Sequence, residues 1–142
     1  MHNLNLNLGT KVVSINGDPD RTIEFNPRDT LFVEKFYQVY SDIQEKQEEL
    51  TTRAKAIDDT PGDDGLPKGF NEQIALINET CVYMREKIDY LFGEGASQTV
   101  FGKVNNLDAI AQFLEGIMPL VMEERSQKVS KYAAKKPTKT ME

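Results

Sequence analysis

Residues 70–102 read FNEQIALINETCVYMREKIDYLF followed by GEGASQTVFG. In the first part, apolar residues recur at alternating steps of four and three: Phe70, Ile74, Ile77, Cys81, Met84, Ile88 and Leu91. This spacing places every member on one narrow stripe of an α-helix over residues 70–92. The sequence therefore predicts that partner helices pack along this stripe.

The glycine-rich stretch after this helix has two interpretations. A phosphate-binding Walker loop needs four residues between two glycines and then Lys and Ser or Thr, and this stretch has neither the spacing nor the ending. Glu94 would also repel a phosphate. We therefore expect Gly93 and Gly95 to end the helix, with a short helical turn over residues 96–101 that places Val100 and Phe101 in the core.

The 142 residues are enough for one domain with a real core. The formal net charge of -6 argues against broad binding to nucleic acid or to anionic membranes, which requires clustered Lys and Arg. No apolar run approaches the ~18 residues of a membrane span, and the first residues lack the pattern of a signal peptide. We expect a protein of the cytoplasm.

No reactive group stands out. Cys81 lies on the helical stripe, so we expect a small core residue, and His2 has no partner of the kind that a triad or metal site needs. The acidic residues fall on solvent faces of predicted helices or in a connector. The sequence predicts no catalytic residue, no cofactor and no metal site.

Residues 1–26 have the period of strands. Asn and Leu alternate over residues 3–8, residues 11–15 are β-branched, and residues 21–25 alternate again. Turn formers occupy residues 16–20, including Gly17 and Pro19. We expect a β-hairpin of two strands, or of three if residues 3–8 join it, whose apolar face packs on helices or pairs with another chain.

A long first helix is predicted over residues 27–57, with Asn26 as N-cap and Pro27 at its first position. Its apolar stripe includes Val33, Phe36, Tyr40, Ile43, Gln47, Leu50, Ala54 and Ile57. The polar Gln47 is either a register device between helices or the point where the core ends, and we favour the second interpretation. The connector at residues 58–69 contains four aspartates but lacks the spacing of a calcium loop.

A third helix is predicted over residues 106–132, capped by Asn105 or Asn106 and kinked at Pro119. Its apolar stripe is wide enough to contact two neighbours. Basic residues then accumulate, and residues 133–142 are expected to form a flexible basic tail. The predicted fold is mainly α: a three-helix antiparallel bundle with an N-terminal β-hairpin, in a single domain over residues 1–132.

Large side chains beside the helical seams are the candidates for binding a partner, although tyrosines in such positions are also common as half-buried core residues. The candidate partner-binding residues are Phe32, Tyr37, Tyr40, Tyr83, Phe113, Met118 and Met122.

Several stretches together resemble the small tail assembly chaperone-like proteins encoded by long-tailed phages and prophages of Gram-positive bacteria. They are IEFNPRD at residues 23–29, LFVEKF at residues 31–36, FGEG at residues 92–95, VFG at residues 100–102, FLEGIMPLV at residues 113–121, and the Lys131-Tyr132 pair. The resemblance implies a non-enzymatic protein of the bacterial host cytoplasm that binds the tape measure protein and tail tube proteins during tail assembly. It also implies a longer frameshifted product, for which Lys135-Lys136 could be encoded by a slippery run.

Two other functions fit the same composition. A phage-encoded acidic protein could inhibit a host defence enzyme by occupying its nucleic-acid channel. A structural subunit could form a homo-oligomer through its N-terminal hairpin. Neighbouring genes for the tape measure and tail tube would favour the chaperone over the inhibitor.

Overall fold

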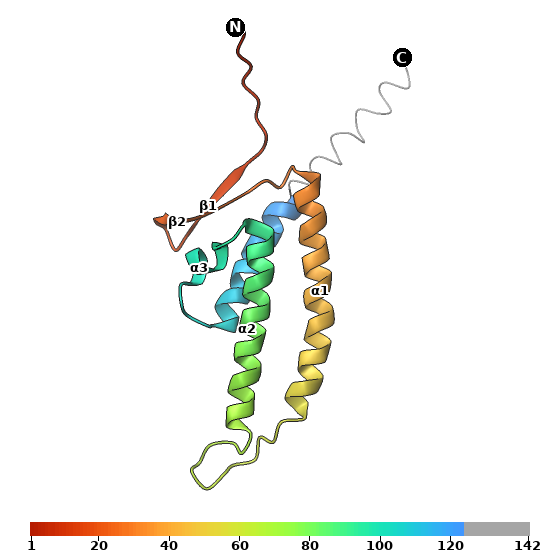
Figure 1. Cartoon of the computed structure of the whole chain (residues 1–142), viewed down its shortest axis with the longest axis vertical. Coiled ribbons are helices and arrows are strands. Elements are labelled where there is room, and N and C mark those ends of the chain that lie inside the picture. The colour runs from red at the N-terminus through yellow and green to blue at the C-terminus, as the bar shows by residue number, and fades with distance from the viewer. Residues whose placement is uncertain (124–142) are drawn as a thin grey trace, which may run out of the picture.

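The computed structural model of the chain describes residues 1–123 (Figure 1). In chain order, these residues form β1 (Lys11–Ile15), β2 (Asp18–Phe25), α1 (Thr30–Lys55), α2 (Phe70–Phe92), α3 (Ala96–Phe101) and a fourth helix over residues 107–123. In Figure 1, α1 and α2 run antiparallel along the long axis, and the fourth helix, in blue, lies behind their upper half. The predictions of a mainly helical chain and of an N-terminal hairpin are confirmed. The predicted helical residues 124–132 and the basic tail lie outside the described residues.

The hairpin turn is shorter than predicted. Asn16 and Gly17 have φ angles of 53° and 73°, and β2 begins directly after them at Asp18. Positive φ at both central residues gives a two-residue turn whose twist matches that of the strands it joins. Pro19 therefore lies in β2. Each strand of a two-stranded sheet has one edge without a neighbouring strand, and a residue whose N–H would face that edge can be proline because no hydrogen bond is needed there.

The hairpin has two strands, one of the two expected alternatives, and residues 3–8 do not join it as a third strand. These residues lie outside β1 and β2, and Leu4, Leu6 and Leu8 are 83%, 76% and 70% exposed. The ladder ends where Lys11 pairs with Phe25, because Asn26 and Pro27 follow and proline has no N–H to donate. Period-two alternation marks a segment that suits a strand, but it does not supply the neighbouring strand.

The start of α1 also differs from the prediction. Asp29 is the N-cap, and its side chain accepts a hydrogen bond from the Leu31 N–H at 3.0 Å. Asn26 instead accepts from the Arg28 N–H at 2.9 Å, which closes a turn before the helix. Both residues are good caps, and the helix begins at the later one because Asn26 and Pro27 complete the turn that connects the hairpin to the helix.

Only one half of the α2 stripe is covered. Cys81 and Ile88 are fully buried, whereas Phe70, Ile74 and Ile77 near the start of the helix are exposed. The prediction that partner helices cover the whole stripe is therefore wrong. The same boundary occurs on α1, whose buried residues end at Val39. Gln47 is exposed beyond this boundary, which agrees with the interpretation that the core ends there.

The glycine corner after α2 is confirmed. Gly93 and Gly95 have φ angles of 107° and 86°, which favour glycine, and α3 follows at once. The Asp89 side chain accepts a hydrogen bond from the Ser97 N–H at 2.7 Å. Val100 is buried and Phe101 is half-buried, as predicted.

Two arginines hold the corner against its neighbours. From β2, Arg21 donates to the carbonyl oxygens of Thr99, at 3.2 Å, and of Val100. From α2, Arg85 donates to the carbonyl oxygens of Gly102 and, at 3.0 Å, of Val104. These carbonyls lie at and beyond the end of α3, where helical partners run out, so the guanidinium groups satisfy them.

An aromatic cluster joins the hairpin to the helices. Its rings are Phe25 of β2, Phe32 of α1, Phe92 of α2, Phe101 of α3 and Phe113 of the fourth helix. Phe92 lies 5.7 Å from Phe25, 5.8 Å from Phe32 and 5.5 Å from Phe113, measured between ring centroids. These separations suit favourable tilted and edge-to-face contacts. Asn106 accepts a hydrogen bond from the Ala109 N–H at 3.1 Å, so it caps the helix that carries Phe113.

We expect Phe92→Ala to lower the free energy of unfolding by about 3 kcal/mol, because it removes the ring that contacts three others. Leu31→Ala is the matched control, since Leu31 is 67% exposed near the start of α1 and its loss should cost within about 0.5 kcal/mol. Urea denaturation followed by circular dichroism measures both changes. Equal small losses would show that the cluster is not what joins these elements.

Candidate partner-binding groove

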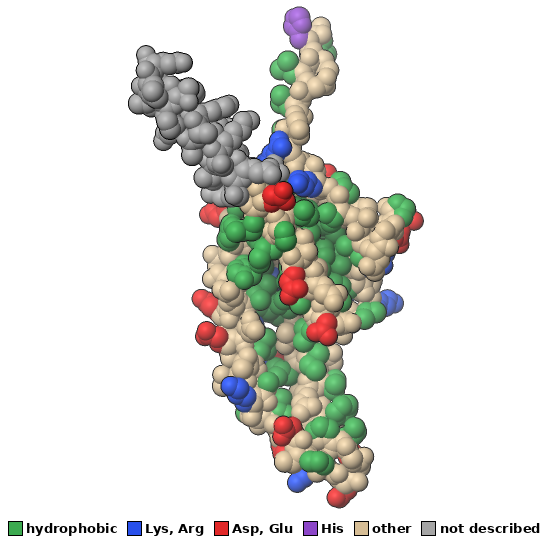
Figure 2. Space-filling model, turned by 180° about the vertical axis from the view of Figure 1, so that it is seen from behind, with side chains coloured by type: hydrophobic (Ala, Val, Ile, Leu, Met, Phe, Trp, Pro, Cys, Tyr) green, Lys and Arg blue, Asp and Glu red, His purple; other side chains and the backbone are tan. Residues whose placement is uncertain are grey.

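An open groove of about 560 Å³ lies where α1, α2 and the fourth helix meet. Figure 2 shows hydrophobic side chains gathered around a hollow on this face of the molecule. The side chains that form its walls include Tyr40, Ile43, Gln47 and Leu50 from α1, Thr80, Tyr83 and Met84 from α2, and Leu107, Ala111, Leu114 and Met118 from the fourth helix. The groove is therefore an apolar surface that the chain leaves open to solvent.

Helical periodicity explains why these residues share the groove. On the fourth helix, the apolar groove residues Leu107, Ala111, Leu114 and Met118 recur at steps of four, three and four. On α1, Tyr40, Ile43, Gln47 and Leu50 recur at steps of three, four and three. Each set forms a single stripe along its helix. The buried side of the fourth helix is a different stripe, formed by Ile110, Ile117 and Val121. The fourth helix thus has an apolar surface wider than its own core requires.

Small and polar residues keep the groove from closing. Ala111 is exposed on the wall of the fourth helix, and Gln47 is exposed on the wall of α1. Thr80 on α2 turns its hydroxyl to the Leu76 carbonyl oxygen of its own helix, at 2.8 Å. A large apolar residue at any of these positions would fill part of the space between the helices.

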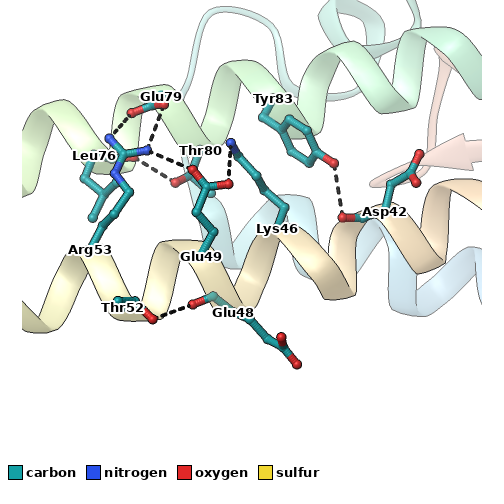
Figure 3. A network of polar contacts seen from close by, with 10 residues as sticks. All are labelled: Asp42, Lys46, Glu48, Glu49, Thr52, Arg53, Leu76, Glu79, Thr80 and Tyr83. Atoms are coloured by element: carbon teal, nitrogen blue, oxygen red, sulfur yellow. Dashed lines mark hydrogen bonds and ion pairs between the residues drawn. The ribbon is translucent and has the colours of Figure 1, made fainter.

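A network of charged residues connects α1 with α2 beside the groove (Figure 3). Arg53 of α1 donates to the Glu79 carboxylate of α2 through its two terminal guanidinium nitrogens, Nη1 and Nη2, at 3.0 and 2.6 Å. Glu49 pairs with Lys46, at 3.1 Å, and lies 3.7 Å from Arg53. These exposed pairs each contribute little to stability, but the fork-to-carboxylate geometry of Arg53 fixes how the two helices align.

Tyr83 is held at the edge of the groove by contacts on several sides. Its hydroxyl donates to the Asp42 carbonyl oxygen at 3.2 Å. The ammonium groups of Lys46 and Lys87 lie 5.3 and 5.4 Å from the centre of its ring, within cation–π range. Lys87 also pairs with the Asp42 carboxylate at 3.1 Å. The ring is thus a preorganised part of the groove wall.

The ion pairs keep their charges over a wide pH range. The hydrogen bond from Lys87, followed by that from Gln38, lowers the pKa of Asp42, and the same Asp42 contact raises the pKa of Lys87. Likewise, the hydrogen bond with Arg53 lowers the pKa of Glu79. These groups therefore stay ionised at neutral pH and act as fixed charges.

Cys81 is not part of the groove. Its side chain is fully buried, as predicted, and burial raises the pKa of its thiol. A raised pKa keeps the sulfur protonated and unreactive at neutral pH.

The structure brings together some of the predicted partner-binding residues and separates others. Tyr40, Tyr83 and Met118 line the groove. Beyond the groove, the Tyr37 hydroxyl of α1 contacts the Met122 sulfur of the fourth helix, at 2.6 Å.

The two predicted phenylalanines lie elsewhere. Phe32 and Phe113 belong to the aromatic cluster, where Phe32 is only 9% exposed. Phe32 therefore packs within the core and offers almost no surface to a partner.

Sequence reasoning missed several groove residues, namely Ile43, Leu50, Met84, Leu107, Ala111 and Leu114. Each belongs to a recognised apolar stripe. The available signal was the width of the stripe on the fourth helix, which exceeds what one neighbour can cover.

In residues 1–123, no group of three or more His, Cys, Asp or Glu side chains converges in a way that could hold a metal ion. Two aspartates of the connector accept hydrogen bonds from backbone N–H groups two residues further along the chain. Asp58 accepts from the Thr60 N–H at 3.0 Å and Asp64 from the Leu66 N–H at 3.0 Å. Within these same residues, no helix has the length and apolar character needed to cross a membrane.

The model of a family of unknown function (DUF6673) matches residues 19–142, and the chain belongs to this family. The match includes all the helices and most of β2, and it begins after β1. No curated protein and no solved structure matches the chain significantly.

We expect Lys87→Met to raise the pKa of Asp42 towards its ordinary value of 3.8, because the strongest hydrogen bond to the carboxylate is lost. Titration of the Asp42 carboxyl signal by NMR measures this change, and Lys103→Met, which removes a lysine beyond α3, should leave it unaltered. A depressed folded-state pKa means that the stabilisation by Asp42 is present above pH 3.8 and is lost as the pH falls through the lower, folded value. An Asp42 pKa that does not respond to Lys87→Met would show that this pair does not form.

Proposed function

We propose that this member of the DUF6673 family is a non-enzymatic, chaperone-like protein that holds one face of an amphipathic client helix in the groove. The observation that supports this most directly is the open apolar groove itself, with walls formed by helical stripes. Apolar surface that faces water marks a site for a partner, and a hydrophobic groove between helices suits the apolar face of another helix.

The dimensions of the groove support a helical client. Beyond the buried Phe36 and Val39, its wall on α1 extends from Tyr40 to Leu50, which at the helical rise corresponds to roughly 15 Å. This length accommodates about three turns of a client helix, enough for anchors at positions i, i+3 or i+4, and i+7. An open groove covers one face of such a helix and leaves the opposite face in water, so the client can be released.

Acidic residues on one rim would orient the client. Asp108 and Glu115 lie on the side of the fourth helix, whereas Lys46 on the α1 side is paired with Glu49 at 3.1 Å. An amphipathic helix with basic residues along one border would match this acidic rim in one direction only. Electrostatic complementarity of this kind selects a partner more than it strengthens binding.

The resemblance to tail assembly chaperone-like proteins suggests the client. A tape measure protein is long and helical, and it exposes apolar helical surface until tail tube proteins polymerise around it. In this proposal, the three long helices act as one antiparallel bundle in the cytoplasm of the bacterial host, covering the tape measure until the tube encloses it. The net charge of -6 would keep the loaded complex soluble.

The proposal predicts a tape measure gene beside the gene for this chain, and co-expression with the product of such a gene tests it. We expect affinity purification of a tagged chain to recover the tape measure protein, and fluorescence anisotropy to detect binding of labelled peptides from its amphipathic helices. If both proteins are soluble and no complex or peptide binding is found, the proposal fails.

We expect Ala111→Arg to weaken peptide binding by at least about tenfold, because the long side chain would occupy groove space that the client needs and its charge would be desolvated beneath the client, at a cost above about 1.4 kcal/mol. Gln112→Arg is the matched control, since it adds the same charge at the next exposed position of the same helix but outside the groove. Fluorescence anisotropy measures both affinities, with circular dichroism to check folding. Equal weakening by the two variants would place the client on another surface.

A further inference from the structure

Residues 3–8 have the pattern of a strand, but within residues 1–123 no strand pairs with them. Leu4, Leu6 and Leu8 alternate with asparagines, so an extended backbone places all three leucines on one face. These leucines are the most exposed large apolar side chains of the described residues after Met1. Figure 1 shows this segment, which we call the Asn-Leu arm, extending away from the body of the molecule.

The junction with the body keeps the arm from pairing with β2. Gly9 has a φ of +90°, and a Cβ placed on it would lie 2.5 Å from the Arg28 side chain, so the chain makes a turn here that favours glycine. The Asn26 side chain donates to the Leu8 carbonyl oxygen at 2.6 Å, which anchors the end of the arm. Opposite this point the ladder has ended, because Pro27 cannot donate to it.

The same chain contains an open strand edge. Among residues 1–123 the sheet has two strands, so β1 has a described neighbouring strand on one side, where Val13 pairs with Ile23. Its side chains alternate, with Val13 and Ile15 half-buried towards the core and Val12 exposed. A strand added to this edge would continue the apolar face of Val13 and Ile15 if its own apolar residues pointed the same way.

We propose that the Asn-Leu arm of one copy of this chain adds as a strand to the β1 edge of a second copy, and that the exchange is reciprocal. The arm has six residues and β1 has five, so their lengths match. A two-fold exchange uses both arms and both open edges, and it buries the leucines of both chains. A second copy is the occupant because one sequence contains both halves of the contact.

This dimer would be independent of the proposed client site. Helical residues alone line the groove among those described, and none of them belongs to the hairpin or to the arm. The family model begins at residue 19, so the arm and β1 lie outside the matched region.

The experiment compares the full chain with two triple variants by light scattering after size exclusion and by sedimentation across a range of concentrations. Leu4→Asn/Leu6→Asn/Leu8→Asn removes the apolar face, and Asn3→Ser/Asn5→Ser/Asn7→Ser keeps it. We expect the unaltered chain and the serine variant to form dimers, and the asparagine variant to dimerise at least about a hundredfold more weakly. A monomeric unaltered chain would overturn the proposal, as would an asparagine variant that dimerises normally.

Amide hydrogen exchange then tests where the arm binds. We expect the β1 amides that do not bond to β2 to be protected in the dimer and to lose this protection in the asparagine variant. If the leucine substitutions abolish the dimer while exchange at β1 stays the same, the arm binds elsewhere and the proposed edge pairing is wrong.

Discussion

The contacts of Phe92 with three other phenylalanine rings hold together segments that are distant in the sequence. Phe25, Phe32 and Phe113 come from the hairpin, from α1 and from the fourth helix, and each lies within 5.8 Å of the Phe92 ring centroid. Phe92 is the last residue of α2, so the chain has to turn immediately after it if α3 and the fourth helix are to reach the same cluster. Gly93 and Gly95 make that turn possible. Packing is therefore concentrated at one end of the long helices.

The sparse packing at the other end of α1 and α2 follows from this concentration of contacts. Beyond Val39 on α1 and before Cys81 on α2, no side chain of the two helices is more than half-buried, and the helices are joined by exposed pairs such as Arg53 with Glu79. Such exposed pairs contribute little to stability, and they leave apolar positions uncovered. The groove lies at the boundary between the two regions, where the fourth helix covers only part of the surface of its neighbours. A binding surface thus arises from incomplete coverage, without any special motif.

The hairpin is held in place by contacts at the same end of the molecule. A two-stranded sheet is marginal by itself, and here β2 packs through Phe25 while Arg21 bonds to carbonyl oxygens at the end of α3. These contacts hold β2, and β1 is held mainly by pairing with it. The outer edge of β1 is left unprotected, and the Asn-Leu arm next to it in the sequence has the periodicity of a strand. Exposed strand edges are usually protected in proteins, so this combination is unusual.

Local rules of sequence were sufficient for much of this architecture. Apolar spacing identified the helices, the glycines identified the corner before α3, and the stripe position of Cys81 identified a core residue, because these depend on neighbours within a few positions. The same rules could not choose between Asn26 and Asp29 as the cap, since both have the right side chain. They also could not show that residues 3–8 lack a partner strand, or that Phe70, Ile74 and Ile77 stay exposed. Periodicity tells which residues share a face, whereas the extent of burial depends on where another segment crosses that face. The aromatic cluster and the glycine corner set that crossing point, so only the tertiary structure decided that Tyr40, Tyr83 and Met118 meet in a groove while Phe32 and Phe113 lie in the aromatic cluster.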